Sequence, residues 1–540
     1  MHEQKTASLA LANWWVALIS FLGASVLGVY QVAERSGMFP AIESHELYFG
    51  SVTTHGVLMA FVLTTFVVMG TGYQWGVSSL KRPVWGGSGL GWLAFWVALI
   101  GVAIAAFTLL TGQASVLFTF YPPLAAHPLF YLGATLLVVG SWIWCVQMIM
   151  SMMAWKRENP GKPVPLVMFG VVANAVMWLW TSVGVASEVL FQLIPWSLGI
   201  IDTIDIGLAR TLFSWTLHAI VYFWLFPAYI AMYTLVPKAA GGRLFSDEMG
   251  RIAFIMLTVI SVPIGFHHLY MDPFQAEGWK FLHMFGTFLV MLPTLFTGFT
   301  VIASLEVTGR LHGGKGLFGW IGALPWKEPI VLACGLALVM LIFGGFGGMI
   351  NASYSMNAMV HNTQWITGHF HLIFGGTVVI MYMGIAYYEW PRMTGKALAS
   401  PGMARAQLWL WTIGMFVLTM PWHLIGMQGQ PRRVSSTPYD TPLVETWAAS
   451  EAIMIVGGLI LLVSALMLVL VLVRSHGTKS ATDVSFGYAE PIHPVLALPS
   501  SLNGFKLWNI ILLFYMVASY GYPIAQFFLM PTHGAFAWGV

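Results

Sequence analysis

The stretch HNTQWITGHFHLIFGGTVVIMYMGIAYY, residues 361–388, contains the two features that decide the fold. It carries no Asp, Glu, Lys or Arg, and as a helix it is long enough to cross the roughly 30 Å hydrocarbon core of a bilayer. Beyond its polar start at residues 361–364 it is mostly apolar, and within that part stand two imidazoles, His369 and His371. A polar side chain inside a membrane helix is costly, which predicts a function for both histidines.

The rest of the chain repeats this apolar character. Of the 540 residues, 58% are hydrophobic and 8% are charged, and the mean hydropathy is +0.78. Soluble proteins carry about 25% charged residues, so the composition excludes an ordinary cytosolic protein. The formal net charge of +3 comes from scattered basic residues and gives no basis for a nucleic-acid partner. The sequence predicts an all-α integral membrane protein in a lipid bilayer.

Apolar runs of about 20 residues predict thirteen transmembrane helices in one bundle. We expect them at 14–34, 51–73, 90–111, 127–152, 166–190, 208–236, 250–270, 277–306, 328–349, 358–389, 405–427, 449–473 and 504–530. The longest polar stretches are too short and too rich in Gly, Pro and Ser to form a soluble domain. Residues 1–540 are therefore expected to form a single transmembrane domain.

Basic residues predict the orientation. With a cytoplasmic N-terminal tail at residues 1–13, eighteen Lys and Arg residues lie in inner segments and five in outer segments, which satisfies the positive-inside rule. The C-terminus is then expected outside. The tail has no short apolar region with a cleavage site, so we expect it to be retained. Arg432 and Arg433 form a basic pair on the outer side, which breaks the rule and needs a function of its own.

Two histidine groups lie in the outer half of the predicted bundle. His369 and His371 are two residues apart, so on a helix they diverge by about 200° and can each bind a different metal ion. His55 lies near the outer end of the second span, at a depth comparable to that of His371, and the two could clamp an iron ion axially. Gly56 beside His55 is expected to leave room for a flat ligand.

A third group combines the sixth and seventh spans. His218 and Tyr222 are four residues apart and share a helix face, so the phenol can reach the imidazole. His267 and His268 are adjacent, and both can bind one ion only where the helix bends or ends, which Pro263 favours. His218, His267 and His268 would then form an all-imidazole site with an open position. Ligand type alone leaves copper, zinc and iron open.

These patterns resemble subunit I of the haem-copper oxidases over the range from about His55 to Arg433. The stretches HAIVYFWLFPAYIAMYTLVPK, GFHHLYMDP, ASLEVTGRLHGGKGLFGWI and HNTQWITGHFHL are most similar to the B-type, ba3-like branch. The resemblance implies a low-spin haem, b-type in this branch, held by His55 and His371. It also implies a high-spin, a-type haem with His369 as its axial ligand, and a copper ion, CuB, held by His218, His267 and His268.

The activity implied by the resemblance is the reduction of O₂ to water at the high-spin haem and CuB, coupled to proton translocation. His218 and Tyr222 would be catalytic, with Tyr222 cross-linked to His218 and donating an electron and a proton during O–O cleavage. The electrons would come from cytochrome c or a small copper protein. Cys145 and Cys334 lie in separate spans and cannot build a CuA site, so a subunit II carrying CuA is implied. A small single-helix subunit and the inner membrane of a prokaryote are also expected.

Two further residue sets match the family. The K-type proton pathway of the B branch corresponds here to Tyr229, Tyr233, Ser246, Thr294, Thr297 and Thr300. Without the resemblance, the spacing of the threonines would favour residues that join two packed helices. The haem propionates would be held on the outer side by Arg432, Arg433 and His361, because guanidinium groups form charge-assisted bonds with carboxylates.

Four positions depart from the family pattern or lack an assignment. Ile220 replaces the glutamate of the A-type branch, and Ala219 replaces a proline. Asn357 stands where close relatives can carry an aspartate, and an amide cannot titrate, which puts a proton-loading role there in doubt. Glu188, deep in the fifth span, has no assignment.

Two other functions remain as alternatives. A nitric oxide reductase of the same superfamily would hold a non-haem iron in place of CuB, but that branch typically lacks the site tyrosine and has glutamates near the three histidines. Tyr222 and Ile220 weigh against it. A transporter with histidines along its path is less favoured. It would not explain His369 and His371 on opposite helix faces together with the adjacent pair His267–His268 and with Tyr222 four residues after His218.

Overall fold

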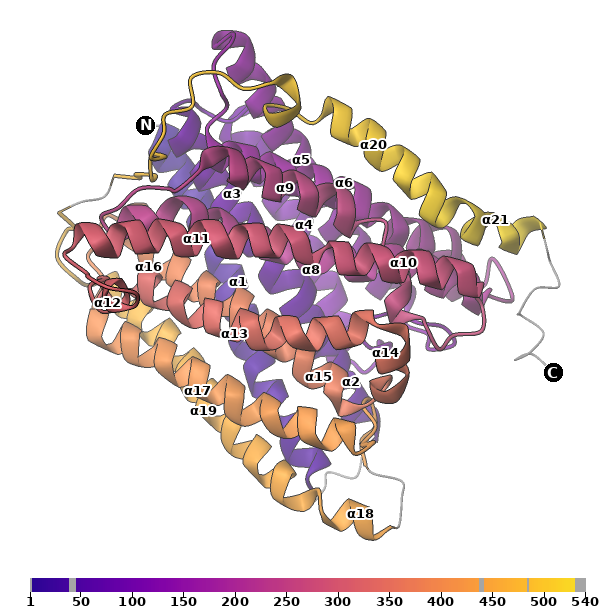
Figure 1. Cartoon of the computed structure of the whole chain (residues 1–540). Helices are drawn as coiled ribbons and strands as arrows, with labels where there is room; N and C mark the ends of the chain where they lie inside the picture. The colour runs from indigo at the N-terminus through magenta and orange to yellow at the C-terminus, as the bar shows by residue number, and fades with distance from the viewer. Residues whose placement is uncertain (1, 38–44, 437–440, 483–484, 530–540) are drawn as a thin grey trace.

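The computed structural model describes residues 2–37, 45–436, 441–482 and 485–529, and the regular elements of this part of the chain are all helices, without a strand. Its long helices run side by side in one bundle, and the C-terminal helices α20 (Lys506–Met516) and α21 (Tyr522–Leu529) lie along one edge (Figure 1). The predicted all-α membrane bundle is confirmed.

The first half contains α1 (His2–Arg35), α2 (His45–Gly56), η1 (Val57–Leu63), α3 (Thr64–Leu80), α4 (Gly87–Leu110), α5 (Pro128–Glu158), α6 (Leu166–Glu188), η2 (Val189–Leu193), α7 (Ile194–Ser197), α8 (Ile206–Ala239), α9 (Asp247–Ser261) and η3 (Phe266–His268). The second half contains α10 (Glu277–Leu289), α11 (Met291–Leu311), α12 (Gly319–Gly322), α13 (Pro329–Ala352), α14 (Tyr354–Val360), α15 (Gln364–His371), η4 (Leu372–Val379), α16 (Ile380–Thr394), α17 (Pro401–Met427), α18 (Pro442–Glu445), α19 (Ala448–Ser475), η5 (Ser500–Leu502), α20, η6 (Val517–Gly521) and α21. The η segments are π-helical except η3 and η5, which are 3₁₀-helical.

In the described chain, 12 helices, several of them made of more than one element, are long and apolar enough to cross a membrane. They coincide with all but one of the predicted spans. The exception is the seventh, expected at 250–270, where α9 has only 15 residues and ends at Ser261. Pro263 lacks a backbone N–H and Gly265 follows it, so the helix does not continue.

The chain nevertheless crosses the bundle at this point. The Leu244 N–H donates to the Glu490 carbonyl (2.9 Å), before α20 begins, and the Gln526 side chain in α21 donates to the Phe274 carbonyl (3.3 Å). Residues 244 and 274 therefore lie at opposite ends of the C-terminal span Lys506–Leu529. The crossing is completed by α9 together with the irregular segment that carries His267 and His268.

The most enclosed helices carry several of the candidate histidines. In the spans Ile206–Ala239 and Gln364–Thr394, 94% and 83% of the apolar window is buried, against 33% in the peripheral spans Thr6–Arg35 and Lys506–Leu529. The histidines of α8 and α15 are thus held in the interior of the bundle, away from lipid.

Two helices change geometry next to a histidine. The π-helical η1 begins two residues after His55, and the π-helical η4 begins at the residue after His371. Such turns occur frequently at functional sites. Sequence periodicity did not predict them.

The two chain ends compare differently with the prediction. Residues 6–13, expected in a separate tail, belong to α1, whose candidate span begins at Thr6. The sequence TASLALAN there is apolar enough to extend the helix. The predicted outer position of the C-terminus concerns residues 530–540, which lie outside the described residues.

Candidate functional site

One cavity of about 500 Å³ lies between the interior helices. All six candidate histidines line it, together with Tyr222 and the outer residues His361, Arg432 and Arg433. The histidines, listed by chain order, are His55, His218, His267, His268, His369 and His371. Segments that are distant in the sequence therefore converge on a single enclosed space.

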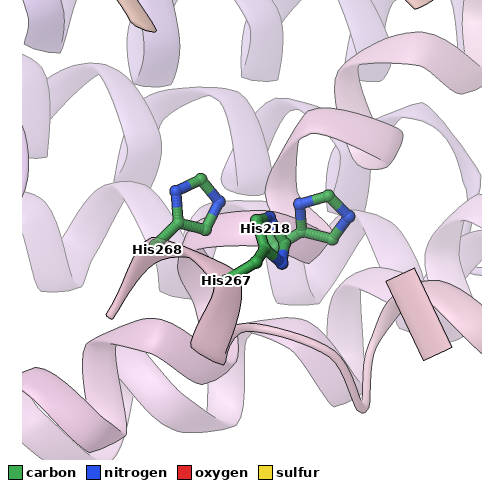
Figure 2. A group of neighbouring side chains, drawn as sticks. All are labelled: His218, His267 and His268. Atoms are coloured by element: carbon green, nitrogen blue, oxygen red, sulfur yellow. The ribbon is translucent and has the colours of Figure 1, made fainter. Parts of the chain in front are cut away.

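Three of these histidines form a compact cluster (Figure 2). One ring nitrogen from each of His218, His267 and His268 lies within 4.8 Å of the others, and no other such cluster of metal-binding side chains is found among the described residues. His267 and His268 can face one point because the chain is no longer α-helical there: η3 brings their ring centroids to 4.2 Å. The sequence predicted that the helix bends or ends at this pair, and α9 ends earlier, at Ser261.

The hydrogen bonds of the cluster leave at least one nitrogen of each ring for a metal ion. The Nδ1 atom of His267 bonds to the Thr287 hydroxyl (3.1 Å), and Nε2 of His218 bonds to the Tyr222 hydroxyl (3.0 Å). The Nε2 atom of His268 is buried and has no hydrogen-bond partner among the described residues. A buried unpartnered nitrogen is costly, and a metal ion would satisfy it. The donor set therefore fits a three-imidazole metal site.

His55 and His371 face each other across a second part of the cavity. Their rings are nearly parallel, at 21°, with centroids 6.3 Å apart. This gap is too wide for ring contact and admits one metal ion bound to a nitrogen of each ring at about 2 Å. The Nδ1 atoms are both occupied, at 2.8 Å, by the backbone carbonyls of Ala24 and Thr367, which leaves Nε2 of each ring for the metal.

The His369 side chain projects from the opposite face of α15, the helix that also carries His371. Its Nδ1 atom bonds to the Gly344 carbonyl of α13 (3.0 Å), so it too has Nε2 free for a ligand. A Cβ atom at Gly347 would lie 2.9 Å from Nδ1 of His369, so the ring packs closely against the backbone of α13. The structure thus agrees with two histidines serving two different sites.

Glycines next to His55 act differently from the prediction. A Cβ atom at Gly56 would lie 2.7 Å from Cβ of Phe118, so this side chain fills the space that was expected for a flat ligand. Gly28 in α1 lies against the imidazole instead, because its Cβ atom would stand 3.2 Å from Cε1 of His55. Sequence analysis did not predict the role of Gly28, because the sequence of an apolar span does not show which neighbouring helix each of its residues will contact.

The end of the cavity that carries Arg432 and Arg433, which the sequence predicts to face outside, is strongly basic. Arg432 donates to the Asn362 side chain (3.2 Å), but its buried Nε has no partner among the described residues. Burial, together with the neighbouring charge of Arg433, lowers the pKa of Arg432 well below its ordinary value. Arg210 and Arg35, which sequence analysis did not single out, also line the cavity. Their signal in the sequence was that they too are basic residues on the outer side. Arg210 is paired with Asp272 (2.8 Å), whereas Arg35, Arg432 and Arg433 have no ion pair among the described residues and call for an anionic ligand.

His361 and Asn357 connect this basic end to the three-histidine cluster. The Nδ1 atom of His361 bonds to the Asn357 side-chain oxygen (2.9 Å), and the Asn357 amide donates to the His267 carbonyl (3.3 Å). Burial first, and then the charge of Arg432, lowers the pKa of His361 to about 4. In its neutral form His361 can bridge the two regions by hydrogen bonds.

The hydroxyl residues of the predicted proton pathway are brought together only in part. The Tyr229 hydroxyl donates to Thr294 (3.3 Å), and the buried Tyr233 hydroxyl donates to Thr297 (3.1 Å). Tyr229 and Thr294 also line the cavity, whereas the other pathway residues do not. Thr300 bonds to a carbonyl of its own helix, and Ser246 caps the N-terminus of α9, accepting from Met249 N (3.2 Å).

Glu188 lies apart from this arrangement. Its carboxyl group is fully buried at the end of α6, and neither oxygen has a partner among the described residues. It does not line the cavity. The structure assigns it no contact with the candidate metal sites.

Comparisons with known proteins agree with this geometry. The family model described as "Cytochrome C and Quinol oxidase polypeptide I" matches residues 8–460. Cytochrome c oxidase subunit 1 of Thermus thermophilus is 39% identical and aligns over 93% of this chain and 90% of its own, and the protein of the same name from Thermostichus vulcanus is 25% identical over 76% and 74%. A solved haem-copper terminal oxidase has a TM-score of 0.91 and 35% identity, covering 96% of this chain and 92% of that chain. The chain therefore belongs to the family of haem-copper oxidase subunit I, and it is a multi-pass membrane oxidoreductase subunit.

Proposed function

We propose that the chain is the catalytic subunit of a B-type oxidase that reduces O₂ to water with electrons from cytochrome c and couples the reaction to proton translocation. One observation carries the proposal: six histidines line one cavity as a facing pair, a single ring and a cluster of three, with Tyr222 bonded to the cluster.

The ligand assignments follow this grouping. His55 and His371 would hold a b-type low-spin haem, and His369 the iron of an a-type high-spin haem. His218, His267 and His268 would hold CuB. When bound, the high-spin haem and CuB supply adjacent redox metals that deliver electrons to O₂, whose reduction to two waters consumes four electrons and four protons.

Tyr222 is placed to hold and release a proton at the site. Its hydroxyl lies 3.0 Å from Nε2 of His218, and its ring lies inside the cavity. The same contact supports the covalent His218–Tyr222 link, which stays a prediction. A phenol at this place also favours the oxidase over the nitric oxide reductase.

Protons would enter from the inner side along α8 and α11. The pairs Tyr233–Thr297 and Tyr229–Thr294 supply two hydrogen-bonded steps towards Tyr222. Ser246 would stand at the inner mouth of the proton pathway. Thr300 would supply a hydroxyl between Ser246 and these two pairs. Water molecules are expected to join the steps that are not in direct contact.

At the outer end, Arg432, Arg433 and His361 would bind the haem propionates. The buried guanidinium groups lack a carboxylate partner of their own among the described residues, and propionates would supply it. Their positive charge would stabilise additional electrons on the metals below. In the orientation predicted from the count of basic residues, this end of the cavity would face outside and the N-terminus would lie inside.

A subunit II is the expected partner, and we propose that it carries CuA and docks at this outer end. A small single-helix subunit would complete the complex in the bilayer. Cytochrome c, or a small copper protein, would deliver electrons from the outer side. Cys145 and Cys334 are both buried in separate helices, so this chain cannot supply such a copper site itself.

The proposal is tested by metal analysis and by reduced-minus-oxidised spectra of the purified complex, with and without carbon monoxide. We expect two haems per chain, one of which binds carbon monoxide, and copper retained with the chain. Non-haem iron without copper would overturn the oxidase in favour of nitric oxide reduction. A preparation without haem would overturn the whole proposal.

A further inference from the structure

We propose that His283 is a positioning residue for the copper ligands, and that it ties them to the C-terminal helices. The inference rests on the proposed copper site. The segment from Ile264 to Leu269 carries His267 and His268 but belongs to no long helix, so something else must hold its conformation. The contacts of His283 in α10 meet this need.

His283 uses both ring nitrogens on backbone groups. Its Nδ1 atom accepts the N–H groups of Gly265 (3.0 Å) and Phe266 (3.2 Å). Its Nε2 atom bonds to the carbonyl of Ser519 in η6 (3.1 Å), which fixes the tautomer with the proton on Nε2. The side chain is fully buried, and its ring stacks on Phe266 with centroids 3.9 Å apart and planes 6° apart.

The same face of α10 also touches a copper ligand directly. Thr287, four residues after His283, bonds to Nδ1 of His267 (3.1 Å). Gly286 lets the helix approach this closely, because a Cβ atom there would collide with Ile264 and stand 2.7 Å from the Tyr515 hydroxyl. One helix face therefore contacts the ligand segment and the C-terminal helix at once.

The C-terminal helix closes the other side of the segment. The Tyr520 ring meets Phe266 edge-on, with centroids 5.2 Å apart. A Cβ atom at Gly265 would collide with the Ser214 carbonyl of α8 and the Tyr520 hydroxyl. The segment is thus packed between α8, α10 and η6. The match to the family model ends at residue 460, before α20 begins. The contact between the C-terminal span and the ligand segment therefore involves residues beyond that match.

The consequence is that copper retention depends on a residue that does not bind copper. Groups that orient metal ligands typically contribute about 10- to 100-fold to metal affinity. Removing the polar contacts of His283 should therefore loosen the two adjacent ligands, while the haem ligands on α2 and α15 keep their own contacts.

Three variants in the intact complex test this. His283→Phe keeps an aromatic ring on Phe266 and removes the hydrogen bonds. His283→Asn offers a side-chain oxygen near the position of Nδ1 and can restore the acceptor for Gly265 and Phe266. Asn509→Ala is the matched control, because Asn509 in α20 accepts from the Trp180 indole (2.8 Å) and ties the same helix to the bundle away from the ligand segment.

The readouts are copper per haem after graded exposure to a copper chelator, and the C–O stretching band of carbon monoxide photolysed onto the copper. We expect His283→Phe to retain copper about 10-fold less well and to shift or broaden the band. His283→Asn should recover part of both, and Asn509→Ala should match the unaltered complex. If His283→Phe does not assemble, the comparison of His283→Asn with Asn509→Ala still decides the question.

The outcomes separate the two proposals. An unaltered complex without copper would overturn the proposed function. Copper in the unaltered complex, with unchanged copper retention and an unchanged band in the His283 variants, would overturn only the positioning role. Equal copper loss in Asn509→Ala would also overturn it, because the effect would then come from general loosening of α20.

Discussion

At the scale of single residues, the proposed ligands are oriented by their second ring nitrogens. His55, His369 and His371 each direct Nδ1 at a backbone carbonyl, at 2.8 to 3.0 Å. This fixes the tautomer and the ring plane, so that Nε2 faces the cavity. The sequence predicted the ligand types from their spacing. It could not identify the carbonyls of Ala24 and Gly344, because these belong to other helices and the packing between helices is not encoded in a local pattern.

Removing one ring of the three-histidine cluster should remove copper without disturbing the facing pair. In His218→Ala a direct ligand is lost. We therefore expect copper retention to fall by more than the roughly 10- to 100-fold that is typical when a residue that only orients a ligand is changed. The low-spin haem spectrum should persist, because His55 and His371 keep their carbonyl bonds. Metal analysis and spectra of the purified variant check this. Unchanged copper content would contradict the assignment of His218.

Removing the phenol hydroxyl should separate catalysis from assembly. Tyr222→Phe loses one hydrogen bond, worth about 1 kcal/mol, so both haems and copper should remain bound. Turnover should fall by about 10²- to 10⁴-fold, the range for loss of a group that transfers a proton. Oxygen consumption by the purified complex measures it. Activity equal to that of the unaltered complex would remove Tyr222 from the proposed mechanism.

At the scale of elements, apolar length was the dependable signal, and local breaks were not. The 12 long spans were predicted because a membrane requires an apolar helix of a minimum length. Pro263 indicated that this helix bends or ends nearby. The residue at which α9 ends, Ser261, depends on how the following residues pack against α8 and α10. The π-helical turns after His55 and His371 left no trace in the apolar pattern, because every neighbour on those helices is apolar or small.

The close packing of the ligand segment gives a test at this scale. Gly265→Ala should be destabilising by about 1–3 kcal/mol, because the added methyl group meets the Ser214 carbonyl and the Tyr520 hydroxyl. Thermal unfolding of the complex, with copper analysis alongside, measures it. Gly278→Ala is the matched control, since nothing lies within 4 Å of a Cβ atom there and alanine favours the helix. Equal stability of both variants would contradict the tight packing of the segment.

At the scale of the whole molecule, basic side chains gather at one end of the central cavity. Arg35, Arg210 and the adjacent pair Arg432 and Arg433 come from three separate parts of the chain, and all four line one cavity. The positive-inside rule identified Arg432 and Arg433 as an exception in the sequence, but it could not show that Arg35 and Arg210 converge with them. That convergence depends on long-range contacts, such as the Arg432 N–H to the Asn362 carbonyl (2.9 Å), which no local pattern encodes.

The orientation of the molecule depends on whether the chain crosses at α9. Between Asp202 and Lys315 lie α8, the short α9 and the span Glu277–Leu311. If α9 and the segment after it make a crossing, as the contacts at Leu244 and Phe274 indicate, the two positions lie on opposite sides. If α9 turned back, they would share one side, and the basic residues after α11 would face outside against the positive-inside rule.

Site-directed labelling distinguishes these topologies. Both native cysteines are buried, so a membrane-impermeant thiol reagent should react weakly with the unaltered chain. Asp202 and Lys315 are exposed. In sealed right-side-out vesicles we expect Asp202→Cys to be labelled and Lys315→Cys to be labelled only after the membrane is opened. Labelling of both positions in sealed vesicles would mean that α9 does not cross, and the outer position proposed for the C-terminus would then reverse.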